Sequence, residues 1–269
     1  MSTEGRNPRS FSVDSMSAAQ IVRLMDEEEA VVVRALRAAE EAIAQAAEKV
    51  AEVFTKGGRI IYVGAGTSGR IALMDAAEMG PTFSVDEDRF VAVTSGGPKA
   101  ERTANEGAED DDHAAVGAMN ALNVSRYDAV FGITASGRTP FVLAAVRHAR
   151  RKGAWTCGIA NNPQSPLEEL VDHSIVLNTG PEIVTGSTRL KAGTSQKMAL
   201  NRISTTAMIL CGKVVENLMV DVRANNQKLR ERTVRIVRDL THATEEEAIA
   251  ALEGAGWSAR VALSSLKGS

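Results

Sequence analysis

The sequence predicts an α/β fold in which a parallel β-sheet is flanked by helices. From residue 58 onward, short apolar runs of strand length alternate with helical segments or loops. A strand, a loop of small residues and a helix start also follow one another twice, which indicates two equivalent turns in one sheet. The runs that we predict to be strands are Ile60–Val63, Phe90–Val93, Ala129–Ile133, Thr156–Ala160 and Ser174–Leu177.

Residues 1–56 are expected to form an amino-terminal arm followed by helices. The first 16 residues are polar and look extended. Ser17 and Gln20 have the spacing of a capping box, and apolar residues then recur every three or four positions as far as Gly57. One unbroken helix of this length would measure about 60 Å at ~1.5 Å per residue, so we predict a break into two helices.

The predicted sheet domain covers residues 57–220, and a carboxy-terminal segment covers residues 221–269. Residues 193–219 are largely apolar and predict a long helix, whereas residues 226–239 predict a basic amphipathic helix. A small helical appendage is expected from two short helical patterns around Gly254-Ala-Gly256, namely Glu245–Leu252 and Ala259–Leu266.

The composition argues against several classes of function. The formal net charge is -3 and aromatic residues make up only 4%, so nothing favours a nucleic-acid partner. The first residues lack the basic-then-apolar pattern of a signal peptide, and no run approaches the ~20 apolar residues that span a bilayer. We therefore expect a cytoplasmic protein that does not interact with membranes.

The metal-binding residue types give no sign of a metal site. Cys157 and Cys211 lie in apolar stretches without a short ligand spacing, so we expect two reduced thiols. The 4 histidines form no i,i+4 pair and are expected to be structural. We therefore predict no bound metal.

Two loops have the residues of phosphate-binding turns. Gly64-Ala-Gly-Thr-Ser-Gly69 matches a dinucleotide fingerprint only weakly, because no acidic residue clearly ends a second strand about 20 positions later. The hydroxyls of Thr67 and Ser68 fit phosphate better, since hydroxyls and free N–H groups at a helix start bind anions. Ser136 and Thr139 offer the same groups in the second loop, beside Arg138. Ordinary tight turns with capping serines are the alternative.

Glutamates and cations outside these loops are less distinctive. Glu78 falls near the end of the helix predicted after the first loop, and Glu109 lies in an acidic run. From the residues alone, both fit solvated surface positions, and their spacing does not show that they meet. Arg189 and Lys191 lie in a polar stretch before a long helix, which they could cap, or they could reach an anionic ligand.

These segments together resemble the N-acetylmuramic acid 6-phosphate etherases of the sugar isomerase (SIS) domain superfamily. The resemblance runs nearly from end to end of the chain. It is carried by Thr3–Pro8, Tyr62–Arg70, Thr134–Pro140, Gly180–Lys197 and Asn217–Val222. Ala77, Met79 and Gly80 beside Glu78, and Asn161 after a strand, depart from residues that many members have, so the resemblance does not imply a fine substrate preference.

The resemblance implies a five-stranded parallel sheet flanked by helices, and a homodimer. It places the catalytic acid at Glu78 and the catalytic base at Glu109. The implied ligand is a small amino-sugar phosphate. The residues that we expect to bind it are Thr67, Ser68, Ser136, Arg138, Thr139, Arg189 and Lys191, the last two as candidates to complete the partner subunit's site. No cofactor is implied.

The implied reaction converts N-acetylmuramic acid 6-phosphate and water into N-acetylglucosamine 6-phosphate and D-lactate. Elimination from the open-chain aldehyde would begin with removal of the C2 proton by Glu109. Glu78, kept protonated by partial desolvation, would protonate the departing lactyl oxygen, and water would then add at C3. Two alternatives share the phosphate loops: a non-catalytic sugar-phosphate-binding regulator and a sugar-phosphate isomerase. Residues 1–57 lack the compact helix-turn-helix pattern of a DNA-binding regulator.

Overall fold

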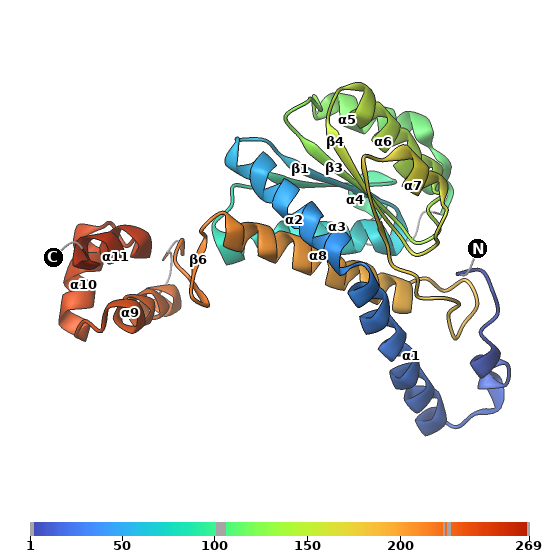
Figure 1. Cartoon of the computed structure of the whole chain (residues 1–269), viewed down its shortest axis with the longest axis horizontal. Helices are drawn as coiled ribbons and strands as arrows, with labels where there is room; N and C mark the ends of the chain where they lie inside the picture. Colours follow the sequence, from blue (N-terminus) through green and yellow to red (C-terminus); the bar gives the residue numbers. More distant parts are fainter. Residues whose placement is uncertain (1–2, 101–105, 223, 225–226, 268–269) are drawn as a thin grey trace. The chain divides into compact units, whose positions relative to one another are not determined.

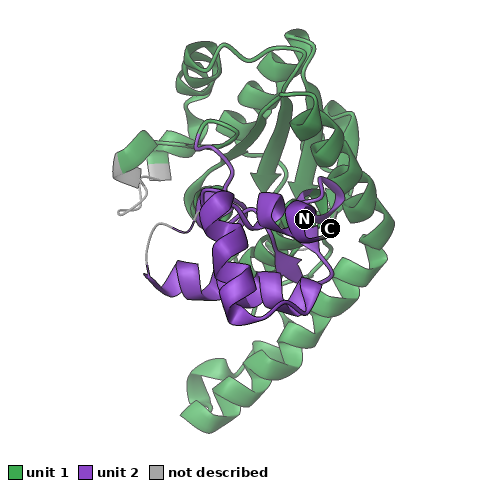
Figure 2. Ribbon diagram, turned by 90° about the vertical axis from the view of Figure 1, so that its left-hand side faces the viewer, with its two compact units in different colours: residues 1–77, 88–207 green, residues 78–87, 208–269 purple. Residues whose placement is uncertain are grey.

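The computed structural model describes residues 3–100, 106–222, 224 and 227–267 (Figure 1). Its contacts divide the chain into two units, which are described separately (Figure 2). Unit 1 consists of residues 1–77 and 88–207, and unit 2 consists of residues 78–87 and 208–269. These units differ from the three predicted segments, because residues 1–56 belong with the sheet and residues 208–220 belong with the carboxy-terminal helices.

A five-stranded parallel sheet with the order β2-β1-β3-β4-β5 forms the centre of unit 1. The predicted strands and their parallel arrangement are therefore confirmed. Every residue of the neighbouring strands β1 and β3 is buried, as expected for a parallel sheet that is covered on both faces. The strands are β1 (Ile60–Gly64), β2 (Phe90–Thr94), β3 (Ala129–Thr134), β4 (Trp155–Ala160) and β5 (His173–Val176).

Helices cover both faces of this sheet (Figure 1). Ile61 and Val63 point to one face, where they pack with residues of α5, α6 and α7. Tyr62 points to the other face, where its hydroxyl donates to Asp75 of α3, and Ser204 of α8 donates to the same carboxylate. The helices after the first strand are α3 (Gly66–Phe83), α4 (Gly97–Ala100), α5 (Asp112–Ala121), α6 (Pro140–Arg151), α7 (Pro166–Leu170) and α8 (Lys191–Leu210), with the 3-10 helix η3 (Glu106–Asp110).

The amino-terminal region contains the predicted pair of helices, α1 (Ala18–Ala38) and α2 (Glu40–Thr55). Both hydrogen bonds of the predicted capping box between Ser17 and Gln20 are present. The arm before α1 is not simply extended, because residues 8–10 and 13–15 form two short 3-10 helices. The Asn7 side chain stabilises the first of them by accepting the backbone N–H of Arg9.

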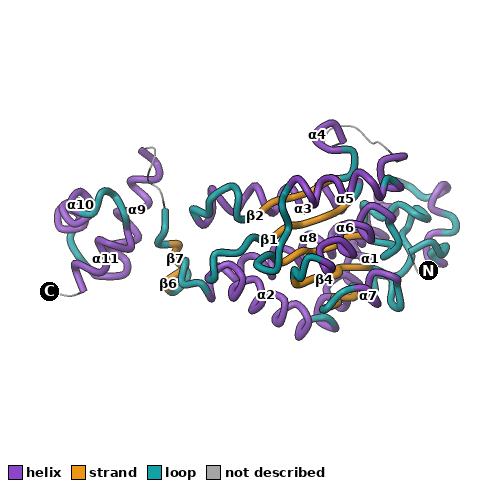
Figure 3. The backbone as a smooth tube through the Cα atoms, turned by 90° about the horizontal axis from the view of Figure 1, so that it is seen from above, coloured by secondary structure: helices purple, strands orange, loops and turns teal. Residues whose placement is uncertain are grey.

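Unit 2 contains a short hairpin and a cluster of helices. The helix predicted over residues 193–219 is wrong beyond residue 210, because Gly212 has a φ of 73° and the chain then turns into strands β6 (Val214–Val215) and β7 (Leu218–Met219). The basic helix and the two tail helices are confirmed and lie side by side (Figure 3). They are α9 (Gln227–Thr241), α10 (Glu245–Gly254) and α11 (Ala259–Lys267).

An apolar core of its own holds unit 2 together. Val237 of α9, Leu252 of α10 and Ala262 of α11 are fully buried in it. Among the residues described, no helix combines the length and apolar character that crossing a membrane requires.

Candidate functional site

The two predicted phosphate loops follow neighbouring strands of the sheet. β1 pairs directly with β3, with Gly64 in register with Ile133, so both loops leave the same carboxyl edge. β1 and β3 are also the strands at which the strand order reverses direction. In open α/β sheets, ligands bind outside the carboxyl ends of the strands at such a switch point. The topology therefore favours the region of these two loops as the ligand site.

The first loop depends on glycines because its backbone turns back on itself. A Cβ atom at Gly64 would lie 2.7 Å from the backbone nitrogen of Gly69, a distance that no side chain tolerates. Gly66, with a φ of 53°, begins α3 in the left-handed region that suits glycine. Helix α8 approaches the loop closely, since a Cβ at Gly193 would lie 3.2 Å from Cγ2 of Thr67.

Ser68 does not point freely into this loop. Its hydroxyl donates to Oε1 of Gln196 at 2.7 Å, and Nε2 of Gln196 donates to Oδ1 of Asn161 at 2.9 Å. Nδ2 of Asn161 in turn donates to Ser195 Oγ at 2.8 Å. This chain of buried polar groups connects the first loop to α8 and to the end of β4. Ser68 could donate to a phosphate only after releasing Gln196, whereas Thr67 is partly exposed.

The second loop presents its hydroxyls around the start of α6. Oγ1 of Thr134 lies 2.7 Å from Oγ1 of Thr139 and 3.3 Å from Oγ of Ser136. Ser136 also accepts the backbone N–H of Arg138 at 3.1 Å, and the Arg138 side chain is exposed. Thr139 precedes α6 but makes no side-chain capping bond to it. The amino terminus of α6 therefore keeps the dipole, and the N–H groups after Pro140, that favour an anion.

A tight contact with the residues after β4 fixes the conformation of this loop. Gly137 has a φ of 70°, and a Cβ there would lie 2.3 Å from Cβ of Ser165. The Gly137 carbonyl accepts the backbone N–H of Leu167 at 3.1 Å. Any larger residue at position 137 would push the loop away from α7.

Arg189 and Lys191, the two predicted cations, occupy different surroundings. Arg189 is exposed, whereas Lys191 is buried and forms an ion pair with Glu28 of α1. Nζ of Lys191 also donates to the Pro181 carbonyl at 2.8 Å. Lys191 thus holds the segment before α8 in place, and any contact of its ammonium with a ligand would compete with these partners.

Glu182 caps the amino terminus of α8. Its carboxylate accepts the backbone N–H groups of Lys191 at 3.2 Å and of Ala192 at 2.9 Å. Burial raises the pKa of Glu182 above its usual value, although these two hydrogen bonds oppose the shift. The spacing between Glu182 and Lys191 therefore has a local role, since it places a carboxylate against the first turn of the helix.

The two predicted catalytic glutamates lie on different units. Glu109 is exposed on η3, which packs against α6 in unit 1. Glu78 is exposed on α3, in the part of that helix that belongs to unit 2. Their pairing stays a prediction. Met79, one of the departures from the family pattern, is only 3% exposed, so it fills a core position.

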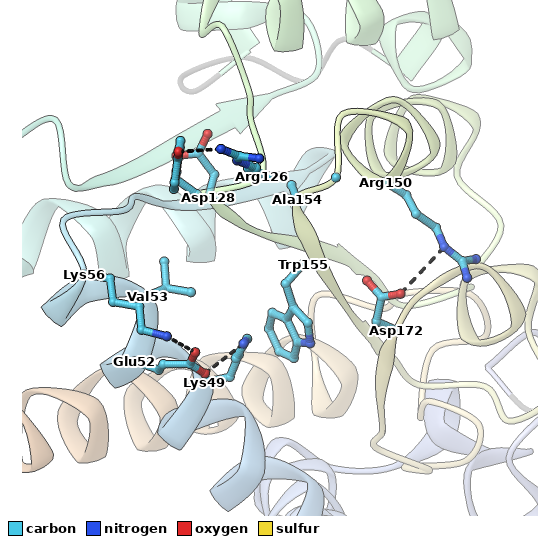
Figure 4. Close-up of a pocket in the computed structure, with 12 residues that line it drawn as sticks. Lys49, Glu52, Val53, Lys56, Arg126, Asp128, Arg150, Ala154, Trp155 and Asp172 are labelled. Atoms are coloured by element: carbon cyan, nitrogen blue, oxygen red, sulfur yellow. Dashed lines mark hydrogen bonds and ion pairs between the residues drawn. The ribbon is translucent and has the colours of Figure 1, made fainter.

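A separate cavity of about 550 Å³ opens near the amino ends of the strands, around Trp155 (Figure 4). Its charged side chains already have partners. Glu52 bonds both Lys49 and Lys56, and Arg150 lies 3.6 Å from Asp172. Since its charges are paired and it lies at the edge opposite the phosphate loops, this cavity does not compete as the ligand site.

Metal-binding residue types do not gather anywhere in the described part of the chain. No group of three or more histidine, cysteine, aspartate or glutamate side chains there could hold a metal ion. Neither Cys157 nor Cys211 takes part in a disulfide bond. Burial raises the pKa of Cys157 well above its usual value, so this thiol is a core group rather than a nucleophile.

Several buried amides near the loops were not predicted as site residues. Asn161, Asn162 and Gln196 all bond to loop residues or to one another. The sequence around an asparagine or glutamine in an apolar segment or a loop does not show which groups its side chain bonds. Only their position directly after a predicted strand, for Asn161 and Asn162, could have drawn attention to them.

Comparison with known proteins agrees with the fold. The SIS domain family matches residues 111–204, and the amino-terminal SIS domain of glucokinase regulatory protein matches residues 42–150. Two phosphoheptose isomerases have the same fold. The structure from Neisseria gonorrhoeae has a TM-score of 0.53 at 23% identity, and that from Francisella tularensis has 0.53 at 19%. Each comparison covers 74% of this chain and 100% of the other.

The sequence relatives are more specific. The N-acetylmuramic acid 6-phosphate etherase of Rubrobacter xylanophilus is 49% identical over 98% of this chain and 88% of its own length. That of Mycolicibacterium smegmatis is 47% identical over 94% of this chain and 86% of its own, and that of Lactobacillus acidophilus is 44% identical over 99% and 90%. At this identity and coverage, the chain belongs to the family of N-acetylmuramic acid 6-phosphate etherases.

Proposed function

We propose that this protein cleaves the lactyl ether of N-acetylmuramic acid 6-phosphate, releasing D-lactate and N-acetylglucosamine 6-phosphate. The observation that carries the proposal is the arrangement of the second loop. The hydroxyls of Ser136 and Thr139 lie next to the amino terminus of α6, which has no side-chain capping bond. Such a site suits the 6-phosphate, which is a handle rather than a reacting group. It would position C2 and C3 of the sugar for chemistry elsewhere in the site.

The first chemical step in this proposal is an elimination. Glu109, as a carboxylate, takes the C2 proton, which the C1 aldehyde of the open-chain sugar makes acidic. The C2–H electron pair forms the C2–C3 double bond as the C3–O bond breaks. Glu78, in its acid form, gives its proton to the departing lactyl oxygen, which leaves as D-lactate.

Hydration completes the reaction. A water molecule adds its oxygen to C3 of the unsaturated aldehyde and gives a proton to the Glu78 carboxylate. Glu109 returns a proton to C2, so both side chains regain their starting states. The balance is one sugar phosphate and one water in, one sugar phosphate and one lactate out, with no oxidation or reduction.

We further propose that the working form is a cytoplasmic homodimer. Glu78 is exposed in the single chain, whereas its proposed role as an acid requires partial desolvation. Substrate and a second subunit together would provide that desolvation. A stable interface should bury about 1,200 Å² or more, and Arg189, exposed before α8, is our candidate for completing the partner's site. A protein that is monomeric by light scattering and still fully active would contradict the proposed dimer.

A lactate-release assay on the purified protein tests the proposed activity. We expect D-lactate from N-acetylmuramic acid 6-phosphate and at least a hundred-fold lower efficiency with the unphosphorylated sugar, since about 3 kcal/mol of charged hydrogen bonds would be lost. Interconversion of sugar phosphates without lactate would indicate an isomerase instead. Tight binding without turnover would indicate a sugar-phosphate sensor.

A further inference from the structure

The amino-terminal arm is hydrogen-bonded to the second phosphate loop through Asn162. Oδ1 of Asn162 accepts the backbone N–H of Thr3 at 3.1 Å, and Nδ2 of Asn162 donates to Oγ1 of Thr3 at 2.7 Å. The same Nδ2 donates to the carbonyl of Ala135 at 3.0 Å. Thr3 is 0% exposed and Asn162 is 2% exposed, so these bonds are shielded from water. One buried amide therefore joins residue 3 to the first residue of the loop.

The contact with Ala135 controls the direction of the peptide that begins the loop. The Ala135 carbonyl also accepts the backbone N–H of Asn161 at 3.0 Å, so two donors hold it. In a planar trans peptide, the carbonyl and the following N–H point in opposite directions. Fixing the Ala135 carbonyl therefore fixes the N–H of Ser136, the first backbone donor of the loop.

A second anchor holds the arm a few residues later. Nδ2 of Asn7 donates to Glu28 at 2.7 Å and to the Pro181 carbonyl at 3.3 Å, and Nη1 of Arg9 donates to Glu28 at 2.9 Å. Glu28 is the partner of Lys191. The arm thus runs from the second loop to the segment before α8, and it is attached at both ends within unit 1.

We propose that residues 3–10 form a strap that positions the second phosphate loop, with Thr3 as a positioning residue that acts through Asn162. The proposal deepens the proposed function and rests on it for the identity of the ligand. Removing the Thr3 hydroxyl takes away a buried hydrogen bond that holds the Asn162 amide in its orientation. The bond from Asn162 to the Ala135 carbonyl then weakens, so the Ala135 peptide is held less firmly, with the backbone N–H of Asn161 as its other donor.

The test compares Thr3→Val with Thr3→Ser in the full-length protein. Valine keeps the shape of threonine but removes the acceptor, whereas serine keeps the acceptor. We expect Thr3→Val to raise the KM for N-acetylmuramic acid 6-phosphate about ten-fold with kcat within about two-fold of the wild type, because ground-state and transition-state binding of the phosphate weaken together. Thr3→Ser should have wild-type constants, as should the control Thr205→Ala on the exposed face of α8.

Hydrogen exchange supplies a readout that does not depend on turnover. In Thr3→Val, the amides of residues 136–139 should exchange faster than in the wild type and in Thr3→Ser. If Thr3→Val does not fold, Asn162→Asp replaces the donor that faces the Ala135 carbonyl and should show both effects.

Any of three results would overturn the proposal that residues 3–10 position the loop. They are an unchanged KM in Thr3→Val, a KM raised equally in Thr3→Ser, and unchanged hydrogen exchange at residues 136–139. A wild-type protein that releases no lactate would count against the proposed function alone, since the exchange experiment would still decide whether the arm positions the loop.

Discussion

Ser68 in the first phosphate loop donates a 2.7 Å hydrogen bond to Oε1 of Gln196 in α8, and both side chains are buried. Gln196 also donates to Asn161, so it connects two buried polar groups. We predict that Gln196→Ala lowers the free energy of unfolding by about 2–3 kcal/mol, because it leaves both groups without this partner. Urea denaturation measures the change.

The matched control for this variant is Thr205→Ala, on the exposed face of the same helix. It should change the unfolding free energy by less than about 0.5 kcal/mol. A Gln196→Ala protein as stable as this control would mean that water replaces the amide and that the buried network is not needed for the fold.

The second loop should determine the affinity for the phosphate. Ser136→Ala and Thr139→Ala each remove one hydroxyl near the start of α6, and a hydrogen bond to a charged group contributes about 1.5–3 kcal/mol. Each variant should therefore raise the KM about ten-fold or more in steady-state kinetics. If alanine at Thr67, Ser68, Ser136 and Thr139 in turn leaves the KM unchanged, the loops do not bind the phosphate.

The buried pair of Glu28 and Lys191 should contribute to stability chiefly through the cost of breaking it. Glu28→Gln leaves the Lys191 ammonium buried without its counter-charge and should cost about 3–5 kcal/mol in unfolding free energy. The double variant Glu28→Gln/Lys191→Met should recover most of that loss, since no unpaired charge remains. A double variant less stable than Glu28→Gln would contradict this explanation.

The same pair predicts a dependence of stability on pH. Burial alone would raise the pKa of Glu28, but hydrogen bonds from Lys191 and Asn7 outweigh it and hold the pKa below its usual value of 4.5. A lowered pKa in the folded state adds stability that is complete above the unfolded value and is lost as the pH falls through the folded one. The stability difference between the wild type and Glu28→Gln should thus shrink below pH 4.5, as urea titrations at several pH values would reveal.

The two glutamates should differ in what their variants still do. Glu109→Gln removes the proposed base, so neither C2 proton exchange nor lactate release should occur. Glu78→Gln keeps that base but denies the lactyl oxygen its proton, so lactate release should collapse while slow C2 exchange survives. Proton NMR in deuterated water follows both reactions. Near-normal lactate release by Glu109→Gln would rule out its role as the base.

The fold could be predicted in detail from the sequence because most of its signals are local. Every predicted strand is present, and β1 to β4 are largely apolar runs bounded by turns or helices. The break between α1 and α2 followed from length alone. The hairpin of β6 and β7 was missed because the apolar residues around Val214 and Leu218 continue the helical pattern. Only Gly212, in a left-handed conformation, marks the end of the helix.

The site could be predicted only where a residue type has a local meaning. Glycines and hydroxyl side chains at the end of a predicted strand indicated the two phosphate-binding loops. The hydrogen bond from Ser68 to Gln196 and the ion pair between Lys191 and Glu28 could not be predicted in this way. In each case, the partner lies more than 100 positions away in the sequence. No spacing rule connects such residues, and a lysine in a polar stretch looks the same whether it ends up buried or exposed.

The most direct test of the central claim is to run the reaction in isotopically labelled water. Elimination removes the C2 hydrogen and breaks the C3–O bond, whereas direct displacement of the lactyl group would leave C2 untouched. We predict that the product sugar formed in deuterated water carries deuterium at C2. In oxygen-18 water, we predict the label at C3 of the sugar, with lactate keeping its original ether oxygen. Mass spectrometry after one turnover measures both labels. Oxygen-18 in lactate, or a C2 hydrogen that has not exchanged, would contradict the account.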